Sequence, residues 1–183
     1  MIPSPEWRTR LVSKDGYLDL AQWVASRPEA TFYDLWGDNI DPKWFFLLGE
    51  AGGATRQQLV FANCAVARLC LHLVPEGENR PRIAVETVEA WVRGEATEEQ
   101  VAKARVNAAM SITTAYYSCP ASYAAYNAAY YANISIYTPT ATDYALQAGI
   151  KNQIICATLR KHLNFERPRE KGLTVWQRLT LED

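Results

Sequence analysis

Apolar residues recur at every third or fourth position along most of this chain, which is the period of an amphipathic α-helix. In the first clear segment, Asp41-Pro42 suits a helix start and Gly52-Gly53 suits a helix stop, so a helix is predicted between them. The next segment, residues 55–74, is apolar on nearly all sides. Its narrow polar stripe runs through Gln57, Arg68 and His72. We expect one helix here that is buried on most sides.

The segment after Pro81 divides into two faces. Its apolar face holds Ala84, Val88, Trp91 and Val92. Its charged face holds Arg82, Glu86, Glu89 and Arg93 at i, i+3 or i, i+4 spacing. This pattern predicts an amphipathic surface helix that closes at Gly94 and has two internal ion pairs, each worth about 0.2–0.5 kcal/mol.

Thr97 and Gln100 have the spacing of a capping box, which predicts the start of a further helix that ends near Ser118. The spacing of its apolar residues predicts a buried stripe made of Val101, Ala104, Ala108, Ile112 and Ala115.

Tyrosines then recur every seven residues, at Tyr116, Tyr123, Tyr130, Tyr137 and Tyr144. Pro120 and Pro139 divide this ladder into three consecutive helices, because proline favours the first turn of a helix. Alanines fill the positions between the tyrosines, so rings of one helix can pack over alanines of the next. The alternation in residues 132–138 is also compatible with a short strand, but a lone strand has nothing to pair with here.

No Asp, Glu, Lys or Arg occurs between Val106 and Thr142. The simpler interpretation is a central helix pair wrapped by the other helices. The alternative is that one side of the ladder stays exposed and is covered by a partner, since large uncharged aromatic surface marks an interface.

Beyond residue 158 the chain becomes polar and basic, with six positive and two negative residues between Arg160 and Arg178. A solvated linker explains this composition, and a contact site for an acidic partner is the alternative.

The predicted fold class is all-α, a single-domain bundle of about seven or eight helices with Ala- and Tyr-rich central helices. Residues 1–40 form its N-terminal part, 41–162 its core helices, and 163–183 a basic linker and a short C-terminal helix.

Composition narrows the class of protein. The 183 residues are 49% apolar and 21% charged, which is typical of one soluble core. A formal net charge of −1 does not support electrostatic capture of nucleic acid or of an anionic membrane. We expect neither a signal peptide nor a spanning helix, because there is no apolar run of about 18 residues. The cysteines form no C-x-x-C pair, which favours a reduced, cytoplasmic compartment.

The sequence offers few candidate residues for metal binding or catalysis. His72 and His162 have no Cys, Asp or Glu at ligand spacing, so no metal site is predicted. Cys119 sits at a predicted helix start but has no base indicated by the sequence. Glycine-rich phosphate motifs and a G-x-S-x-G motif are absent from the sequence, and Glu98-Glu99 suit the first turn of a helix. We therefore expect no catalytic residue and no cofactor, and a protein that is not an enzyme.

The stretch WGDNIDPKW combines acids with tryptophans in a predicted loop, and this composition is typical of protein-contact hot spots. The alternative is a helix cap with two core tryptophans. With two tyrosines of the ladder region, the candidate partner-binding residues are Asp34, Trp36, Asp38, Asp41, Trp44, Tyr126 and Tyr130.

Residues 75–104, PEGENRPRIAVETVEAWVRGEATEEQVAKA, carry a recognisable unit: an acidic turn, R-P-R, an amphipathic helix with a Trp before V-R-G-E-A, and a capped Ala-rich helix. The unit resembles a family of immunity proteins found beside polymorphic bacterial toxins. The residues that match are Arg80, Pro81, Arg82, Glu86, Trp91, Arg93, Gly94 and Glu95, with Pro120 at a later break. Family members have scattered histidines where this chain has Asn107, Asn127, Asn133 and the tyrosines.

The resemblance implies a cytoplasmic binder that neutralises another protein, a toxin or a defence effector. A phage or mobile-element inhibitor of a host defence protein is an alternative within the same class. A helical bundle that binds a small neutral ligand in a Tyr-lined pocket is an alternative of another class, and a scaffold role is a third. We expect no membrane partner and no direct nucleic-acid binding, and homo-oligomerisation remains open.

Overall fold

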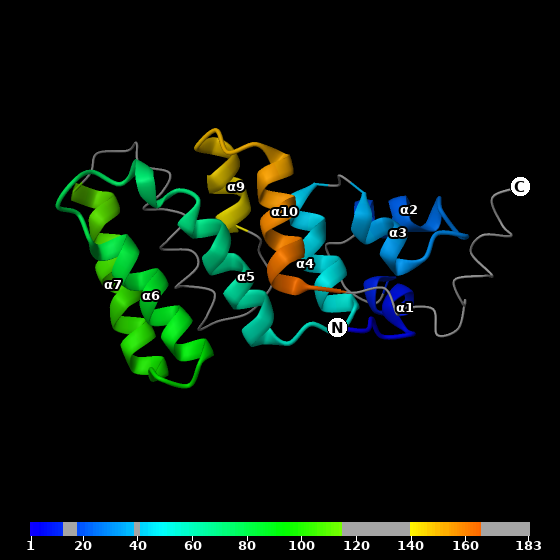
Figure 1. The fold of residues 1–183 in the computed structure, drawn as a ribbon, viewed down its shortest axis with the longest axis horizontal. Helices are drawn as coiled ribbons and strands as arrows, with labels where there is room; N and C mark the ends of the chain where they lie inside the picture. Colours follow the sequence, from blue (N-terminus) through cyan, green and yellow to red (C-terminus); the bar gives the residue numbers. More distant parts are fainter. Residues whose placement is uncertain (13–17, 39–40, 115–139, 166–183) are drawn as a thin grey trace, which may run out of the picture.

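The computed structural model describes residues 1–12, 18–38, 41–114 and 140–165 (Figure 1). Within these ranges the chain forms nine α-helices and one 3-10 turn, without a strand, which confirms the all-α prediction. The helix count exceeds the predicted seven or eight because the N-terminal part contains three short helices. The residues predicted to form the Ala- and Tyr-rich central helices lie mostly in 115–139, outside the described residues.

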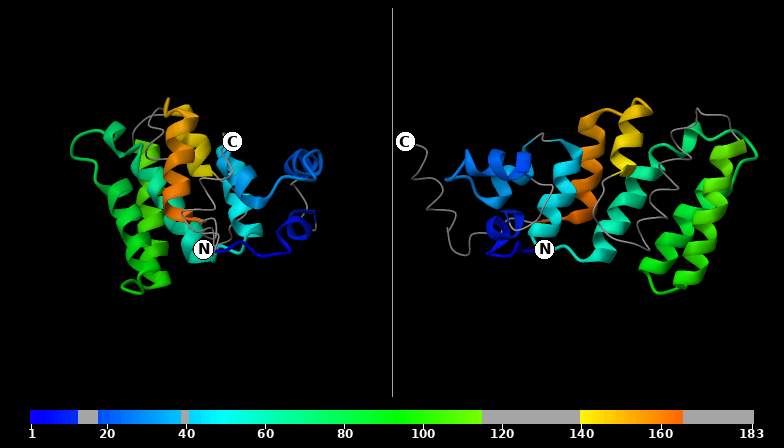
Figure 2. Two further views of the ribbon diagram at one scale, coloured as in Figure 1. Left: turned by 45° about the vertical axis from the view of Figure 1, so that its right-hand side comes forward. Right: turned by 180° about the vertical axis from the view of Figure 1, so that it is seen from behind.

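The helices form an elongated array. The N-terminal helices α1 (Trp7–Val12), α2 (Leu18–Ala25) and α3 (Phe32–Gly37) lie at one end (Figures 1 and 2). Helices α6 (Arg80–Val92) and α7 (Glu98–Thr114) lie at the other. Between them are α4 (Pro42–Ala51), α5 (Arg56–Arg68), α9 (Thr140–Gln147) and α10 (Asn152–Leu163). Helix α5 is central, because it packs against α6, α9 and α10.

Local capping explains several helix starts. The Asp41 side chain accepts a hydrogen bond of 2.9 Å from the Lys43 backbone N–H, and Pro42 opens α4 as predicted. Thr97 and Gln100 form the predicted capping box: the Thr97 N–H donates to Gln100 Oε1 at 2.7 Å, and the Gln100 N–H donates to Thr97 Oγ1 at 3.2 Å. These bonds satisfy backbone donors that have no partner inside the helix. Helix α9 begins directly after Pro139, as expected.

The predicted continuous helix over 55–74 is wrong at its end. Helix α5 stops at Arg68, and residues Leu71–Leu73 form a separate 3-10 turn. Neither glycine nor proline marks this stop. The turn buries Cys70 completely and leaves Leu71 only 7% exposed, while His72 stays exposed. Tertiary burial of Cys70 and Leu71 thus accompanies the end of the helix.

The two ion pairs predicted inside α6 are also wrong. Glu89 pairs with Arg68 of α5, and Arg93 pairs with Glu95 in the following turn, with nitrogen–oxygen distances of 2.6 and 2.7 Å. Side chains from α5 and from the turn compete with the i, i+4 partners that the sequence pattern offers. The buried side of α6 holds Pro81, Ala84, Val85 and Val88, whereas Trp91 and Val92 are half-buried.

Aromatic rings join the N-terminal part to the core. Trp36 of α3 lies 5.6 Å from Phe32, 4.8 Å from Phe45 of α4 and 4.9 Å from Phe165, measured between ring centroids. Phe165 and Leu163 are buried, so the core extends beyond residue 162. Arg160, which begins the polar and basic stretch of the sequence, is in the last turn of α10, and its guanidinium donates to the carbonyls of Trp36, Gly37 and Asp38.

Arg8 has the same role at the end of α2. Its guanidinium donates to the backbone carbonyls of Val24, Arg27, Pro28 and Ala30 at distances from 2.5 to 3.2 Å. The terminal amino group of Met1 donates to the Asn164 carbonyl at 2.7 Å. Charged donors thus bind carbonyls that helix ends leave without partners, and they tie α1, α2 and the end of α10 into one structure.

Candidate protein-contact surface

Three of the predicted contact residues, Asp34, Asp38 and Asp41, lie at helix ends. Asp34 accepts from the Thr31 backbone N–H at 2.8 Å and from the Thr31 hydroxyl at 2.6 Å, forming a capping box at the start of α3. Asp41 caps α4. Asp38 is the C-cap of α3; its carbonyl accepts a bond from Arg160, and the residue is exposed. Of these acids, only Asp38 has no capping hydrogen bond to its carboxylate among the described residues.

Trp36 is a core residue. It is 5% exposed and lies within the ring cluster of α3, α4 and Phe165. Trp36 is therefore a core tryptophan, as in the alternative interpretation of this stretch, and its side chain is not available at the surface. Tyr126 and Tyr130 lie outside the described residues.

Trp44 is different, because its side chain is only half-buried. Its ring lies 5.3 Å from the ring of Trp23, which is also half-buried and belongs to α2, with an interplanar angle of 51°. The guanidinium of Arg27 lies 4.3 Å from the Trp23 ring centroid, and Arg27 is an exposed residue. Two tryptophans and an arginine are thus brought together from segments about 20 residues apart.

Lys43, which precedes Trp44 in α4, forms an ion pair with α9. Lys43 Nζ lies 2.6 Å from Asp143 Oδ1 and links α4 to α9. The hydrogen bond to Asp143 raises the pKa of Lys43. We call Trp23, Arg27 and Trp44 the Trp44 surface. It combines two half-buried aromatic rings with one exposed cation.

Sequence reasoning found Trp44 but missed Trp23 and Arg27. Arg27 follows Trp23 by four residues, and that spacing favours a contact on or near a helix. The contact between Trp23 and Trp44 joins α2 to α4, and no local pattern indicates it.

The described cysteines are buried and poorly suited to nucleophilic chemistry. Burial raises the pKa of the Cys64 and Cys156 thiols, which therefore stay protonated near neutral pH. Cys70 is also buried, and Cys119 lies outside the described residues. Within the described ranges, no three His, Cys, Asp or Glu side chains gather where they could hold a metal ion. His72 is exposed, and the ring of His162 packs edge-on against Phe61 at 5.3 Å.

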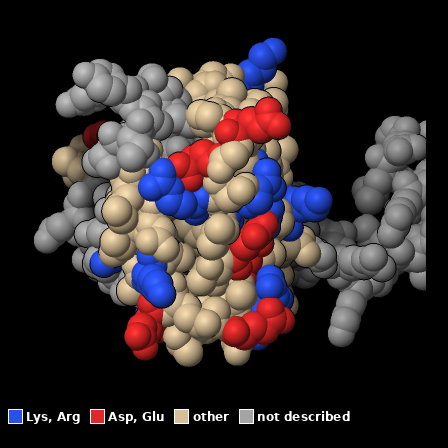
Figure 3. All heavy atoms as spheres, turned by 90° about the vertical axis from the view of Figure 1, so that its left-hand side faces the viewer, with Lys and Arg blue, Asp and Glu red and all other residues tan. Residues whose placement is uncertain are grey.

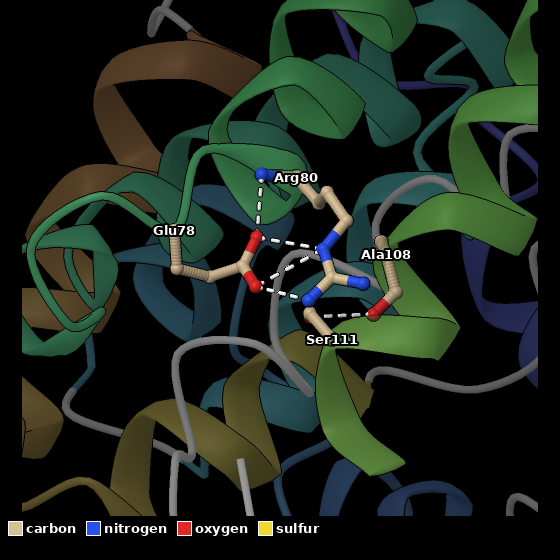
Figure 4. A network of polar contacts seen from close by, with 4 residues as sticks. All are labelled: Glu78, Arg80, Ala108 and Ser111. Atoms are coloured by element: carbon tan, nitrogen blue, oxygen red, sulfur yellow. Dashed lines mark hydrogen bonds and ion pairs between the residues drawn. The ribbon is translucent and has the colours of Figure 1, made fainter. Parts of the chain in front are cut away.

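The R-P-R motif fixes the entry to α6. The Glu78 carboxylate accepts from the Arg80 backbone N–H at 2.9 Å and binds its guanidinium as a bidentate partner (Figure 4). This pairing lowers the pKa of Glu78. On α7, the Ser111 hydroxyl donates to the Ala108 carbonyl at 2.6 Å (Figure 4). The Glu78–Arg80 contact is therefore local to the start of α6, and the Ser111 bond lies within α7.

Comparisons of the chain with protein-family models, with curated proteins and with solved structures find no match. Among the described helices, none is both long and apolar enough to cross a membrane. The class of protein that the fold defines is thus an all-α helical bundle, and its function is inferred from surface chemistry.

Proposed function

We propose that this chain is a non-enzymatic binding protein that neutralises another protein by blocking its active surface, as an immunity protein blocks a toxin. The observation that carries the proposal is the ring pair of Trp23 and Trp44, which is half-buried at the surface with Arg27 against it. Tryptophan and arginine are the residues most enriched at energetic hot spots of protein interfaces.

Such a surface supports binding because part of its apolar area is still accessible to water. A partner that covers the rings removes that area, at about 25 cal/mol per Å². The rings are already held by α2 and α4, so little side-chain entropy is lost on binding. The exposed Arg27 supplies charge beside the rings, where charge sets specificity and association rate. Asp38 is a second exposed charge among the candidate contact residues.

The resemblance of residues 75–104 to immunity proteins agrees with this class of function. A toxin is the proposed target, and a host defence protein inhibited by a phage or mobile element is the second candidate. The proposal includes a cytoplasmic location and no direct binding to nucleic acid. A small neutral ligand bound among the ladder tyrosines is a competing function of another class.

Affinity capture from the native host tests the proposal. A tagged wild-type chain should retain one protein in stoichiometric amount, and Arg27→Glu and Asp38→Lys should each reduce its recovery. Both positions are exposed, so circular dichroism should show unchanged helicity. Arg82→Glu, an exposed change on α6, is the matched control and should leave recovery unchanged.

The competing function predicts another result. Thermal shift across metabolite and nucleotide libraries should give no response if the chain acts only by binding protein. A stabilisation of several degrees by one small molecule, with no captured protein, would contradict the proposal and favour the tyrosine-lined pocket.

A further inference from the structure

Helices α6 and α7 line an open groove of about 550 Å³. One wall comes from α6 and the other from α7, and the lining includes small, polar and charged residues. Among the described residues it is lined by Ile83, Glu86, Thr87, Ala90, Glu95, Ala96, Gln100, Lys103, Ala104 and Asn107. Figure 3 looks onto this end of the molecule and shows charges of both signs interspersed with uncharged surface.

The two walls are in register. Helices α6 and α7 are joined by a short turn and pack against each other, so they run antiparallel. Residues equally far from the turn then lie at the same level. Ile83 of α6 is level with Asn107 of α7, and Glu86 is level with Lys103 and Ala104.

The walls carry opposite charges that are not used within the described part of the chain. Glu86 on the α6 wall and Lys103 on the α7 wall are both exposed, and neither forms an ion pair with a described residue. Glu86 adds to the negative field at Arg68, but Arg68 is already bound by Glu89. One wall therefore offers a free carboxylate at the level where the other offers a free ammonium group.

The same hairpin exposes large apolar side chains near one end of the groove. Ile83 is 50% exposed on α6, and Val106 and Met110 are 53% and 54% exposed on α7. Val106 and Met110 are four residues apart and form a ridge beside Asn107. Ile83 and this ridge lie at the same end of the hairpin, on opposite walls.

We propose that this groove is the contact surface of a two-fold symmetric dimer, in which α6 of each copy packs against α7 of the other. A two-fold axis that runs along the groove, parallel to the helices, places the α6 wall of one copy opposite the α7 wall of the other. It also keeps every residue at the same level along the axis. Glu86 of each copy then faces Lys103 of the second copy, and Ile83 faces the ridge of Val106 and Met110. Neighbouring helices are antiparallel throughout, as in a four-helix bundle.

The size of the hairpin limits the area that this contact can bury, and therefore its strength. Helix α6 has 13 residues, which gives a length of about 20 Å, and two adjacent helices are about 20 Å wide. The resulting footprint of about 400 Å² is half of the ~800 Å² per partner of a standard stable interface. The dimer should therefore be reversible and concentration-dependent. It uses the end of the molecule that lies away from α2 and is independent of the proposed target binding (Figure 1).

Sedimentation equilibrium of the purified full chain tests the dimer through charge swaps. The mass of the wild type should rise towards that of a dimer with concentration. In the proposed dimer, residue 86 of each copy faces residue 103 of the other, so there are two such contacts. Glu86→Lys alone and Lys103→Glu alone each put like charges at both contacts. Each variant should therefore weaken association by at least about tenfold. An equimolar mixture of the two single variants restores both opposite-charge contacts, so it should form a heterodimer as strongly as the wild type associates with itself.

Ile83→Glu should also weaken the dimer, whereas Glu29→Lys, an exposed change near α2 and α3, should not. Circular dichroism confirms that the variants are folded, since positions 83, 86 and 103 are exposed. A monomer at every concentration overturns the proposal and leaves the groove open to a helix of another protein. A dimer that is insensitive to both charge swaps, or a mixture no stronger than the single variants, also overturns it.

Discussion

The guanidinium of Arg68 in α5 binds the carboxylate of Glu89 in α6 through two hydrogen bonds, Nε to Oε1 at 2.6 Å and Nη2 to Oε2 at 2.7 Å. The Glu89 side chain is 13% exposed and that of Arg68 is 40% exposed. This geometry is the strong, bidentate form of a charged hydrogen bond. The pair fastens the central helix α5 to the hairpin of α6 and α7.

Removal of the Arg68 side chain should lower the free energy of unfolding more than neutralisation of Glu89. Arg68→Ala leaves a nearly buried carboxylate without its partner, which should lower the free energy of unfolding by about 1–3 kcal/mol. Glu89→Gln keeps the shape and part of the hydrogen bonding, so its effect should be smaller. Urea denaturation of both single variants and of the double variant measures the coupling energy. Strictly additive effects would show that the two side chains do not support each other.

Arg160 should be a structural residue of the N-terminal part. Its three bonds, to the carbonyls of Trp36 and Gly37 at 3.0 Å and of Asp38 at 2.5 Å, satisfy the C-terminal end of α3. Arg160→Leu should lower the free energy of unfolding by about 1–3 kcal/mol and speed amide exchange in α3. Lys161→Leu changes the adjacent exposed cation and is the control. Equal effects of the two substitutions would refute the capping role.

Gly52→Ala should destabilise the protein even though Gly52 has ordinary helical dihedrals, with φ −65° and ψ −13°. A Cβ atom there would lie 2.8 Å from the Phe32 ring and 2.9 Å from Phe165. We expect a loss of about 1–3 kcal/mol, as for overpacking of a core. Gly37→Ala is the matched control, since a Cβ at Gly37 meets nothing within 4 Å. Thermal denaturation compares the two, and a stable Gly52→Ala variant would contradict the close packing of these rings.

Stability should depend on pH through His162. Burial lowers the pKa of His162 below its ordinary value of 6.5, and the neighbouring Lys161 lowers it further. The unfolded chain then takes up a proton at a higher pH than the folded chain. The free energy of unfolding should therefore decrease as the pH falls through about 6.5 and level off below the folded-state pKa.

The variant His162→Gln should lose less stability than the wild type between about pH 7.5 and pH 5.5. Guanidinium denaturation at several pH values measures both slopes. Identical slopes for the two proteins would show that His162 is not the titrating group.

Local features of the fold were predictable where backbone chemistry decides them. Pro42 after Asp41 opens α4, and Thr97 with Gln100 opens α7, because a cap is made within three residues of chain. The sequence also predicted the helical class, since the apolar period is itself a property of neighbouring residues. The end of α5 at Arg68 was missed because burial of Cys70 and Leu71 depends on distant helices.

The candidate site was less predictable than the fold. Trp36 and Trp44 stand in the same short stretch with similar neighbours, yet Trp36 is buried among rings of α3, α4 and Phe165 while Trp44 remains half-exposed beside Trp23. Which tryptophan faces solvent depends on how α2 and α10 pack. Arg160 likewise resembles a linker residue in sequence, and only its position beside α3 makes it a cap.

The sequence by itself determined the helical class, the starts of α4 and α7 and the absence of recognisable catalytic motifs, because these depend on residues within one or two turns of each other. Tertiary structure decided which charges pair, which aromatic rings stay accessible and which walls of the α6–α7 hairpin share a level. Those properties come from contacts between helices far apart in the chain, and a local pattern leaves several equally good partners open.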